Sequence, residues 1–432
     1  MSRFNLDFAG DTVGSVTVNG QTATWQRIGE ELVITPARAI PRNAVFSVQV
    51  AHFTATPALP DPGNFLGAPF FVTPDGSALA AQPDGAHRIF PSNDHPADKA
   101  TFTTWLDVPV GSTAVASGVE LLELTLFGRS ISLHVQAQPM ATELAQIAVG
   151  AQTVISRGSH DGIQVRDVVP SRLAAELGPK LAIEIAHLDW LEAQLGDYPF
   201  DSYGSLAVDT SLGFALETQT LSLYEVAFFS YPQSVYEPIM VHELAHQWFG
   251  DSVAPTQWAD VWQNEGHATW YEMTWQNAPD SEPFVADMQL YYSYFDLLRF
   301  YYGPVGAPLS GDAAQLFNPN VYYGGALVLY ALRQQVGDED FRAIERAWVT
   351  RNRGTSASTA DFIDLASEIS GEDLHDFLAA WLYGDVTPPM PGHPDWTVTP
   401  VEPVSALARG FQLQVAMPAP LDGNHAAGLA RR

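Results

Sequence analysis

Hydrophobic and polar positions alternate along the first third of the chain in short runs rich in Val, Thr and Phe, with turn residues between them. Examples are Phe4 to Phe8, Val16-Thr17-Val18-Asn19-Gly20, Val45 to Val50 and Leu121 to Phe127. This alternation is typical of half-buried β-strands, and Asn-Gly is typical of a hairpin turn. The pattern predicts a β domain over residues 1–141. Because its first strand begins three residues after Met1, we expect the domain to lack its first strands.

After about residue 142 the hydrophobic period becomes that of a helix. The apolar residues that recur on one face are Leu173, Leu177, Leu181, Ile185, Leu188 and Leu191. Further helical patterns cover about 282–300, 323–336, 338–351, 359–369 and 373–383, whereas 205–208 and 221–229 resemble strands. We expect a helix-rich domain with a small sheet over residues 142–392, followed by a tail or partial strand over 393–432.

The charge and the cysteine content of the chain limit the ligands that it can bind. The chain has 432 residues, of which 46% are hydrophobic, and its 49 acidic and 20 basic residues give a net charge of −29. Such a surface repels phosphate backbones, which argues against nucleic-acid binding. The chain has no cysteine, so any metal must be held by His and carboxylate side chains.

Targeting signals are not evident in the sequence. No window approaches 18 uninterrupted apolar residues, and the N-terminus lacks the apolar run of a signal peptide. We therefore expect a soluble protein without a membrane span, and a cytoplasmic location is favoured over secretion. The oligomeric state is left open.

The sequence Val241-His242-Glu243-Leu244-Ala245-His246 carries the most specific chemical signal in the chain. Glu237-Pro238 before it and Gly250 after it predict a helix of about 12 residues. On a helix, His242 and His246 project from one face and can bind one metal ion. Glu243 lies beside them and is placed to accept a proton from a metal-bound water. The alternative is an ordinary helix whose histidines contact the backbone or solvent.

A third ligand is needed to complete a catalytic zinc site. Glu265 follows His246 by 19 residues in a second helical stretch, and the neighbouring Trp262 and Trp270 indicate that it is buried. The two histidines and Glu265 are therefore the predicted metal ligands.

Two polar residues near this second helix are less specific. Asp260 is equally an orienting carboxylate for a ligand histidine or a helix N-cap. His267 has no spacing that recruits it to the metal and is interpreted as structural.

The stretch from His242 to Gly250, followed by Trp258 and Asn264-Glu265-Gly266, resembles the aminopeptidase N and leukotriene hydrolase family of gluzincin metallopeptidases. Asn93 to Phe102 is similar to that family's N-domain signature, so the resemblance covers about residues 4–390. It implies an α+β fold with a saddle-like antiparallel β domain and a thermolysin-like catalytic domain. It also implies one zinc ion per chain.

The family's Gly-x-Met-Glu-Asn motif, which holds the substrate amine, is partly matched by Phe214-Ala215-Leu216-Glu217-Thr218. The resemblance implies that Glu217 binds a peptide's α-ammonium group and that the backbone of 213–217, including Ala215, runs beside the substrate. Gln82 lies where the family has another amine contact, and an ordinary surface glutamine is the alternative.

The family also uses a tyrosine in a Tyr-x-Lys-Gly-Ala context to stabilise the oxyanion. The segment Tyr322-Tyr323-Gly324-Gly325-Ala326 aligns through Gly325-Ala326, which implies that Tyr322 has this role and that Gly324 replaces the usual lysine. Tyr323 is one residue out of this register and is the alternative.

The resemblance implies a zinc aminopeptidase that acts on peptides with a free N-terminus. An endopeptidase or an epoxide hydrolase on the same zinc site remains open because the residues around Glu217 are substituted, and a catalytically inactive binding scaffold is a further alternative. Relatives of full length usually carry a C-terminal helical domain over the active site, and we expect this chain to lack it.

Overall fold

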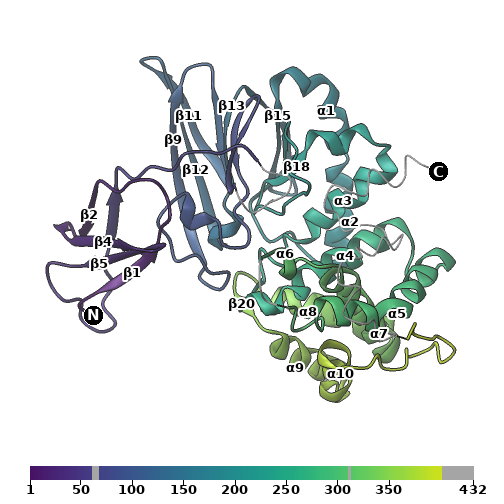
Figure 1. Ribbon diagram of the computed structural model, residues 1–432. Helices are drawn as coiled ribbons and strands as arrows, with labels where there is room; N and C mark the ends of the chain where they lie inside the picture. Colours follow the sequence, from purple (N-terminus) through teal and green to yellow (C-terminus); the bar gives the residue numbers. More distant parts are fainter. Residues whose placement is uncertain (61–67, 310–312, 401–432) are drawn as a thin grey trace, which may run out of the picture.

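The computed structural model describes residues 1–60, 68–309 and 313–400. Strands dominate the first 170 residues and helices dominate the rest, which confirms the expected α+β class (Figure 1). Residues 401–432 of the expected tail lie outside the described residues. Residues 393–400 form no strand.

The N-terminal lobe consists of two small antiparallel sheets around a shared core. The first has the order β1 (Phe4–Asp7), β5 (Glu31–Thr35), β4 (Thr24–Ile28), and the second has the order β3 (Gln21–Thr22), β2 (Ser15–Val18), β6 (Val48–Ala51). Alternate side chains of these strands, such as Val16, Leu32 and Ile34, fill the core, as the period-two pattern predicts. The strand expected from Val45 begins only at Val48.

Two further sheets connect this lobe to the helical part of the molecule. One has the order β10 (Thr113–Ala116), β13 (Ile147–Gly150), β8 (Gly76–Leu79), β7 (Phe70–Thr73), and the other has the order β11 (Val119–Leu126), β12 (Arg129–Met140), β9 (Ala100–Pro109). The chain passes from these sheets to the next one between Gly150 and Gln152, about ten residues beyond the expected boundary at 141.

A five-stranded sheet opens the helical part. Its strands are β14 (Gln152–His160), β15 (Ile163–Pro170), β16 (Ser202–Tyr203), β17 (Ser205–Val208) and β18 (Ser222–Glu225). β15, β17 and β18 run parallel to one another and are buried, which is typical of parallel strands. β19 (Ala254–Pro255) and β20 (Ser356–Ala357) form a short separate pair.

The helices surround one large core. They are α1 (Ala174–Leu181), α2 (Glu184–Leu195), α3 (Gln233–Ala245), α4 (Trp262–Gln276), α5 (Glu282–Tyr302), α6 (Ala313–Leu316), α7 (Gly325–Val336), α8 (Asp338–Arg351), α9 (Thr359–Ser370) and α10 (His375–Tyr383). Short 3-10 helices lie at Ala86–Arg88, Thr142–Leu144, Ser171–Leu173, Val226–Ser230 and Trp258–Asp260, and a π-helix lies at Asn320–Gly324. None of the helices in the described ranges combines the length and the apolar character that crossing a bilayer requires.

Two further expected boundaries are wrong. The helix α3 begins at Gln233, so Pro238 lies inside it and does not mark its start. Tyr236 and Ile239 pack into a hydrophobic cluster and hold the first turns of the helix. The free energy gained by this burial offsets the destabilisation that an internal proline causes. The strand expected over 221–229 stops at Glu225, where a 3-10 helix replaces it.

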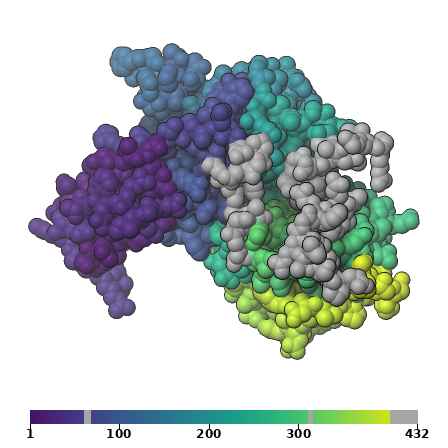
Figure 2. Space-filling view, in the orientation of Figure 1, coloured from purple at the N-terminus to yellow at the C-terminus, as the bar shows by residue number. Residues whose placement is uncertain are grey.

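The space-filling view shows the N-terminal lobe, in purple, standing to one side of the green and yellow helical part (Figure 2). Contacts between the β domain as a whole and the helical part are polar as well as apolar. Lys99 donates from Nζ to the backbone carbonyls of Asp251, Ser252 and Thr355, at 2.6, 2.9 and 3.4 Å. Asp251 and Ser252 follow the metal-binding motif directly, so the β domain supports the chain that leaves the candidate site.

Candidate metal centre and active site

The two predicted histidine ligands lie at the end of α3. His242 is in its last turn, and His246 immediately follows its last residue, Ala245, with a helical backbone conformation. The regular helix therefore ends several residues before Gly250, earlier than expected. The helical geometry is nevertheless kept through His246, so both imidazoles face the same side, with ring centroids 4.8 Å apart.

Glu265 reaches the histidines from the first turns of the neighbouring helix α4. Its Oε2 atom lies 3.4 Å from His242 Nε2 and 3.3 Å from His246 Nε2. The ligand atoms of the three residues lie within 4.8 Å of one another, and all three side chains are buried. The structure thus brings together the metal ligands that the sequence predicts.

Each imidazole uses its other nitrogen to contact an acceptor. His242 Nδ1 lies 3.1 Å from Glu272 Oε2, and His246 Nδ1 lies 3.0 Å from the backbone carbonyl of Phe249. An acceptor at Nδ1 holds that nitrogen as the donor and leaves Nε2 as a free base toward Glu265. The sequence analysis did not identify Glu272. Its spacing of seven residues from Glu265, two turns along α4, was the available signal.

A zinc ion fits the donor atoms of these three side chains. Two imidazole nitrogens and one carboxylate, with room for a fourth ligand, form a set that catalytic zinc uses in proteins. Glu265 Oε2 is buried and has no hydrogen bond among the described residues, although both histidines lie near it. A cation bound between the three side chains would satisfy this oxygen. His242, His246 and Glu265 would hold it.

The predicted base, Glu243, adjoins the cluster. Burial raises the pKa of its carboxyl to about 8, although the charges of His242 and His246 act in the opposite direction. One ligand atom each of Glu217, Glu243 and His246 lie within 4.8 Å of one another. The carboxylate predicted to accept a proton therefore lies close to both a metal ligand and the carboxylate predicted to bind an amine.

Glu217 and Gln82 meet although they are far apart in the sequence. Gln82 donates from Nε2 to Glu217 Oε1 at 2.6 Å, and only 3% of Glu217 is exposed. The contact joins the β domain to the helical part beside the metal cluster. It favours the interpretation of Gln82 as part of the site over that of an ordinary surface glutamine.

The segment that contains Ala215 lies along the edge of the five-stranded sheet. Leu216 exchanges two backbone hydrogen bonds with Leu223 of β18, at 2.9 and 2.7 Å. Because successive residues of an extended chain direct their backbone groups to opposite sides, those of Ala215 are directed away from β18. An extended peptide can pair with this outer side.

The two candidate tyrosines have different surroundings. Tyr322 lies in the π-helix with its ring stacked 6.0 Å from that of His242, whereas Tyr323 is buried and stacks 4.7 Å from Tyr291 in the core. The structure therefore places Tyr322 at the metal cluster. π-helical turns are frequent at functional sites.

A glycine contact sets the approach of the Tyr322 segment to α4. A Cβ atom on Gly266 would lie 2.9 Å from Gly325 Cα, and one on Gly325 would lie 2.7 Å from Gly266 Cα. The two backbones touch directly beside Glu265. Gly324, where the family has lysine, is equally confined, because a Cβ atom there would lie 2.2 Å from Asn320 Oδ1.

Asp260, which the sequence left open, and His267, which it indicated to be structural, both make structural contacts. Asp260 Oδ1 accepts hydrogen bonds from the backbone and the hydroxyl of Thr359, so it neither orients a ligand histidine nor caps its own helix. His267 is buried, contacts the carbonyl of Gln263 through Nδ1 and lies 3.2 Å from Glu345.

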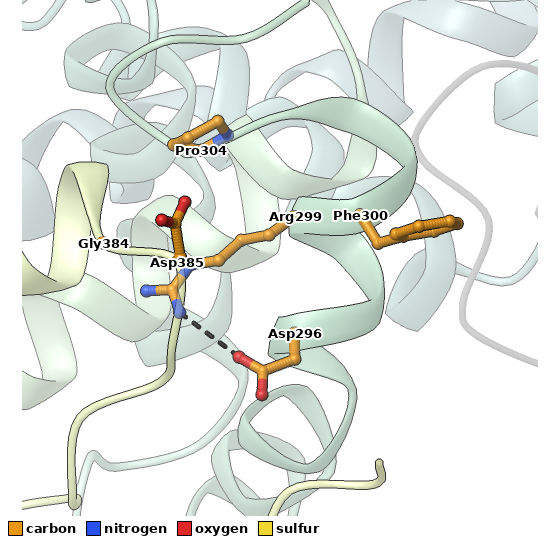
Figure 3. Close-up of a pocket in the computed structure, with 6 residues that line it drawn as sticks. All are labelled: Asp296, Arg299, Phe300, Pro304, Gly384 and Asp385. Carbon is orange, nitrogen blue, oxygen red and sulfur yellow. Dashed lines mark hydrogen bonds and ion pairs between the residues drawn. The ribbon is translucent and has the colours of Figure 1, made fainter. Parts of the chain in front are cut away.

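A separate pocket of about 400 Å³ lies between the end of α5 and the chain after α10. It is lined by Asp296, Arg299, Phe300, Pro304, Gly384 and Asp385, and Figure 3 shows the ion pair between Arg299 and Asp296 inside it. The guanidinium also donates to the carbonyl of Trp381, which fastens α10 to α5. No residue of the predicted site lines this pocket.

The fold and the cluster define a class of protein. A helix with His-Glu-x-x-His beside a second helix that supplies a glutamate is the metal site of a large class of metallopeptidases. Residues 180–381 match the Peptidase family M1 domain, which agrees with this class of metallopeptidase. This part of the chain therefore contains the domain of this family.

Curated relatives include Aminopeptidase 2 of Candida albicans, which is 29% identical over 69% of this chain and 34% of its own length. Aminopeptidase N of Streptomyces lividans is 28% identical over 87% of this chain and 46% of its own length. The chain thus spans a third to a half of these relatives.

Solved structures match over nearly the whole chain. A two-domain M1 zinc metallopeptidase bound to L-arginine has a TM-score of 0.79 and 27% identity, over 90% of this chain and 88% of that one. An M1 zinc metallopeptidase from Deinococcus radiodurans bound to a Tyr-Ser-Ala substrate has a TM-score of 0.75 and 27% identity, over 91% and 89%. The two-domain arrangement is therefore shared with proteins of similar length.

Proposed function

We propose that this chain is a zinc-dependent aminopeptidase that removes the N-terminal residue from peptides. The observation that carries the proposal is the position of Glu217, whose carboxylate lies within 4.8 Å of ligand atoms of both Glu243 and His246. A carboxylate that binds the substrate's ammonium group at this short range from the metal allows only the first peptide bond to reach it. The zinc and aminopeptidase names of the relatives support the same proposal.

His242, His246 and Glu265 would hold one zinc ion per chain. When bound, zinc lowers the pKa of a coordinated water and polarises the substrate carbonyl. The remaining steps belong to protein side chains.

Glu243 accepts a proton from the attacking water and passes it to the leaving amine. Its buried position beside the metal ligand His246 suits this role. The phenol of Tyr322 donates a hydrogen bond to the carbonyl oxygen as negative charge develops there.

Glu217 and Gln82 would hold the α-ammonium group. The two side chains already lie 2.6 Å apart, so a cation beside Glu217 also meets the amide of Gln82. The outer side of Ala215 would pair with the peptide backbone and align the scissile bond with the metal.

A reporter assay with aminoacyl substrates tests the proposal. Hydrolysis should stop when a chelator removes the metal and return when zinc is added. Glu243→Gln should lower kcat by about 10²-fold or more while the zinc content stays the same.

An N-acetylated peptide of the same sequence serves as the second substrate. Glu217→Ala should impair hydrolysis of the free peptide much more than that of the acetylated one. Equal cleavage of both peptides by the unaltered protein would instead identify an endopeptidase, and zinc binding without hydrolysis of any substrate would identify a binding scaffold.

A further inference from the structure

Gln247 directly follows the ligand His246, and its side chain is fully buried. Its Oε1 atom accepts hydrogen bonds from the backbone N–H of Thr220 at 2.9 Å and from the hydroxyl of Tyr198 at 3.1 Å. Its Nε2 atom donates to the backbone carbonyl of Glu217 at 3.2 Å. One amide therefore connects the metal-binding motif to both ends of the short segment 217–220.

This segment has an unusual backbone. Thr220 has a φ of +68°, which is rare for a β-branched residue and is maintained only when the surroundings enforce it. The hydroxyl of Thr220 accepts a hydrogen bond from Gly118 N at 2.7 Å, and Gln219 N donates to the carbonyl of Leu144 at 3.0 Å. The β domain holds the segment from one side, and Gln247 holds it from the other.

The hydrogen-bonding roles require an amide at position 247. The Oε1 atom acts as an acceptor while Nε2 acts as a donor, and a carboxylate cannot donate. A glutamate there would also place negative charge beside the carbonyl of Glu217. A methionine of similar length would fill the space and make none of the three hydrogen bonds.

We propose that Gln247 is a positioning residue that fixes the distance between the amine-binding carboxylate of Glu217 and the metal, and thereby sets the preference for substrates with a free α-amine. The inference rests on the proposed aminopeptidase function. It extends that function to a residue that contacts neither substrate nor metal. Loss of the amide should weaken recognition of the amine and leave recognition by the metal unchanged.

Two inhibitors separate these two kinds of recognition. Leucine hydroxamate carries a metal-binding group and an α-amine, whereas 4-methylpentanohydroxamate carries the same metal-binding group without the amine. The ratio of their inhibition constants measures the benefit of the amine alone. Zinc content and thermal unfolding are measured on the same samples.

In Gln247→Met we expect the benefit of the amine to fall about tenfold, the loss that a misplaced charge-assisted hydrogen bond produces. The inhibition constant of the amine-free compound and the zinc content should not change. Gln247→Glu should also lose the benefit, because it keeps the acceptor and loses the donor. This second variant retains the polarity of the site, so the test stands if Gln247→Met does not fold.

Gln136→Met is the matched control. Gln136 is 1% exposed, and its Nε2 atom donates to the backbone carbonyl and to the side-chain oxygen of Gln138 in the same strand, β12. This variant should keep the full benefit of the amine even if its stability falls.

Three results have different meanings. An unchanged benefit in both Gln247 variants, with zinc retained, overturns the role of Gln247 and leaves the proposed function intact. Loss of zinc, or equal weakening of both inhibitors, also overturns it, because it shows that Gln247 supports the metal site in general. If the unaltered protein gains nothing from the amine, the proposed function itself fails.

Discussion

Glu272 shows how a single residue determines the chemistry of a neighbour. Its carboxylate lies beside Nδ1 of His242, and this contact selects the tautomer that presents Nε2 to the metal. Sequence reasoning found His242 and His246 because their four-residue spacing follows from helix geometry, and it found Glu265 because a zinc site needs a third ligand and the family resemblance supplies the spacing. It missed Glu272 because its partner lies on another helix, and the distance between helices is not encoded in local spacing.

We predict that Glu272→Gln lowers zinc affinity about 10- to 100-fold, since an amide holds the imidazole less firmly than a carboxylate. Competition with a chromogenic chelator measures the change. Glu282→Gln, at an exposed position at the start of α5, should leave the affinity unaltered. Equal affinities of the protein and Glu272→Gln would show that the contact has no influence on the metal.

The tyrosine pair gives a second prediction for single residues. Tyr322→Phe should lower kcat about 10²-fold with little change in KM, because the hydrogen bond forms only as charge develops on the carbonyl oxygen. Tyr323→Phe is the control, since its ring packs against Tyr291. Steady-state kinetics of both variants measure these effects. The assignment of Tyr322 is wrong if Tyr323→Phe has the lower kcat of the two variants.

At the scale of elements, the position of Tyr322 depends on the contact of α4 with the segment at the start of α7. Gly266 and Gly325 meet backbone to backbone, so no side chain separates the helix that carries Glu265 from the π-helix. Hydrophobic periodicity predicted α5, α7, α8, α9 and α10 well. It gave no indication of the π-helix or of the glycine contact, because both depend on the packing of one element against another.

Gly266→Ala tests this contact. The added methyl group would force the two elements apart, so the free energy of unfolding should fall by about 1–3 kcal/mol and kcat should fall with it. Gly178→Ala is the control inside α1, where the new Cβ atom meets only the end of Ile155, at 3.1 Å. Chemical denaturation and the reporter assay measure both effects, and normal activity in Gly266→Ala would contradict the proposed coupling.

At the scale of the whole molecule, His87 connects the N-terminal lobe to the rest of the chain. Its Nδ1 lies 2.7 Å from Asp94, its Nε2 lies 3.7 Å from Glu30, and its carbonyl accepts from Ala9 N. The hydrogen bond to Asp94 raises the pKa of His87 above 6.5, and the opposing effect of burial is smaller. The charge of this imidazole therefore contributes one contact to the lobe, the one to Glu30, beside backbone hydrogen bonds such as that of Asp7 with Ser92.

This contact predicts a pH dependence. Because the folded pKa is raised, the stabilisation is complete below pH 6.5 and disappears as the pH rises through the folded value. The difference in melting temperature between the protein and His87→Gln should therefore shrink above pH 6.5. A difference for His87→Gln that stays constant across the pH range would contradict the prediction.

The organisation of the whole chain was predicted only in part. The change from period two to period 3.6 near residue 142 indicated the order of the domains, because each pattern depends on local burial. Contacts such as that of Gln82 with Glu217, which are 135 residues apart, have no local pattern. Their partners were identified through the family resemblance.

The chain contains two lysines, both partly buried, whose ammonium groups have different surroundings. Burial lowers the pKa of Lys99 to about 8, and its ammonium group is enclosed by backbone carbonyls at the junction of the two parts. Lys180 retains 30% of its side-chain exposure. An amine-reactive dye should therefore label Lys180 and spare Lys99 in the native state, which makes the appearance of dye on Lys99 a site-specific reporter of separation between the β domain and the helical part.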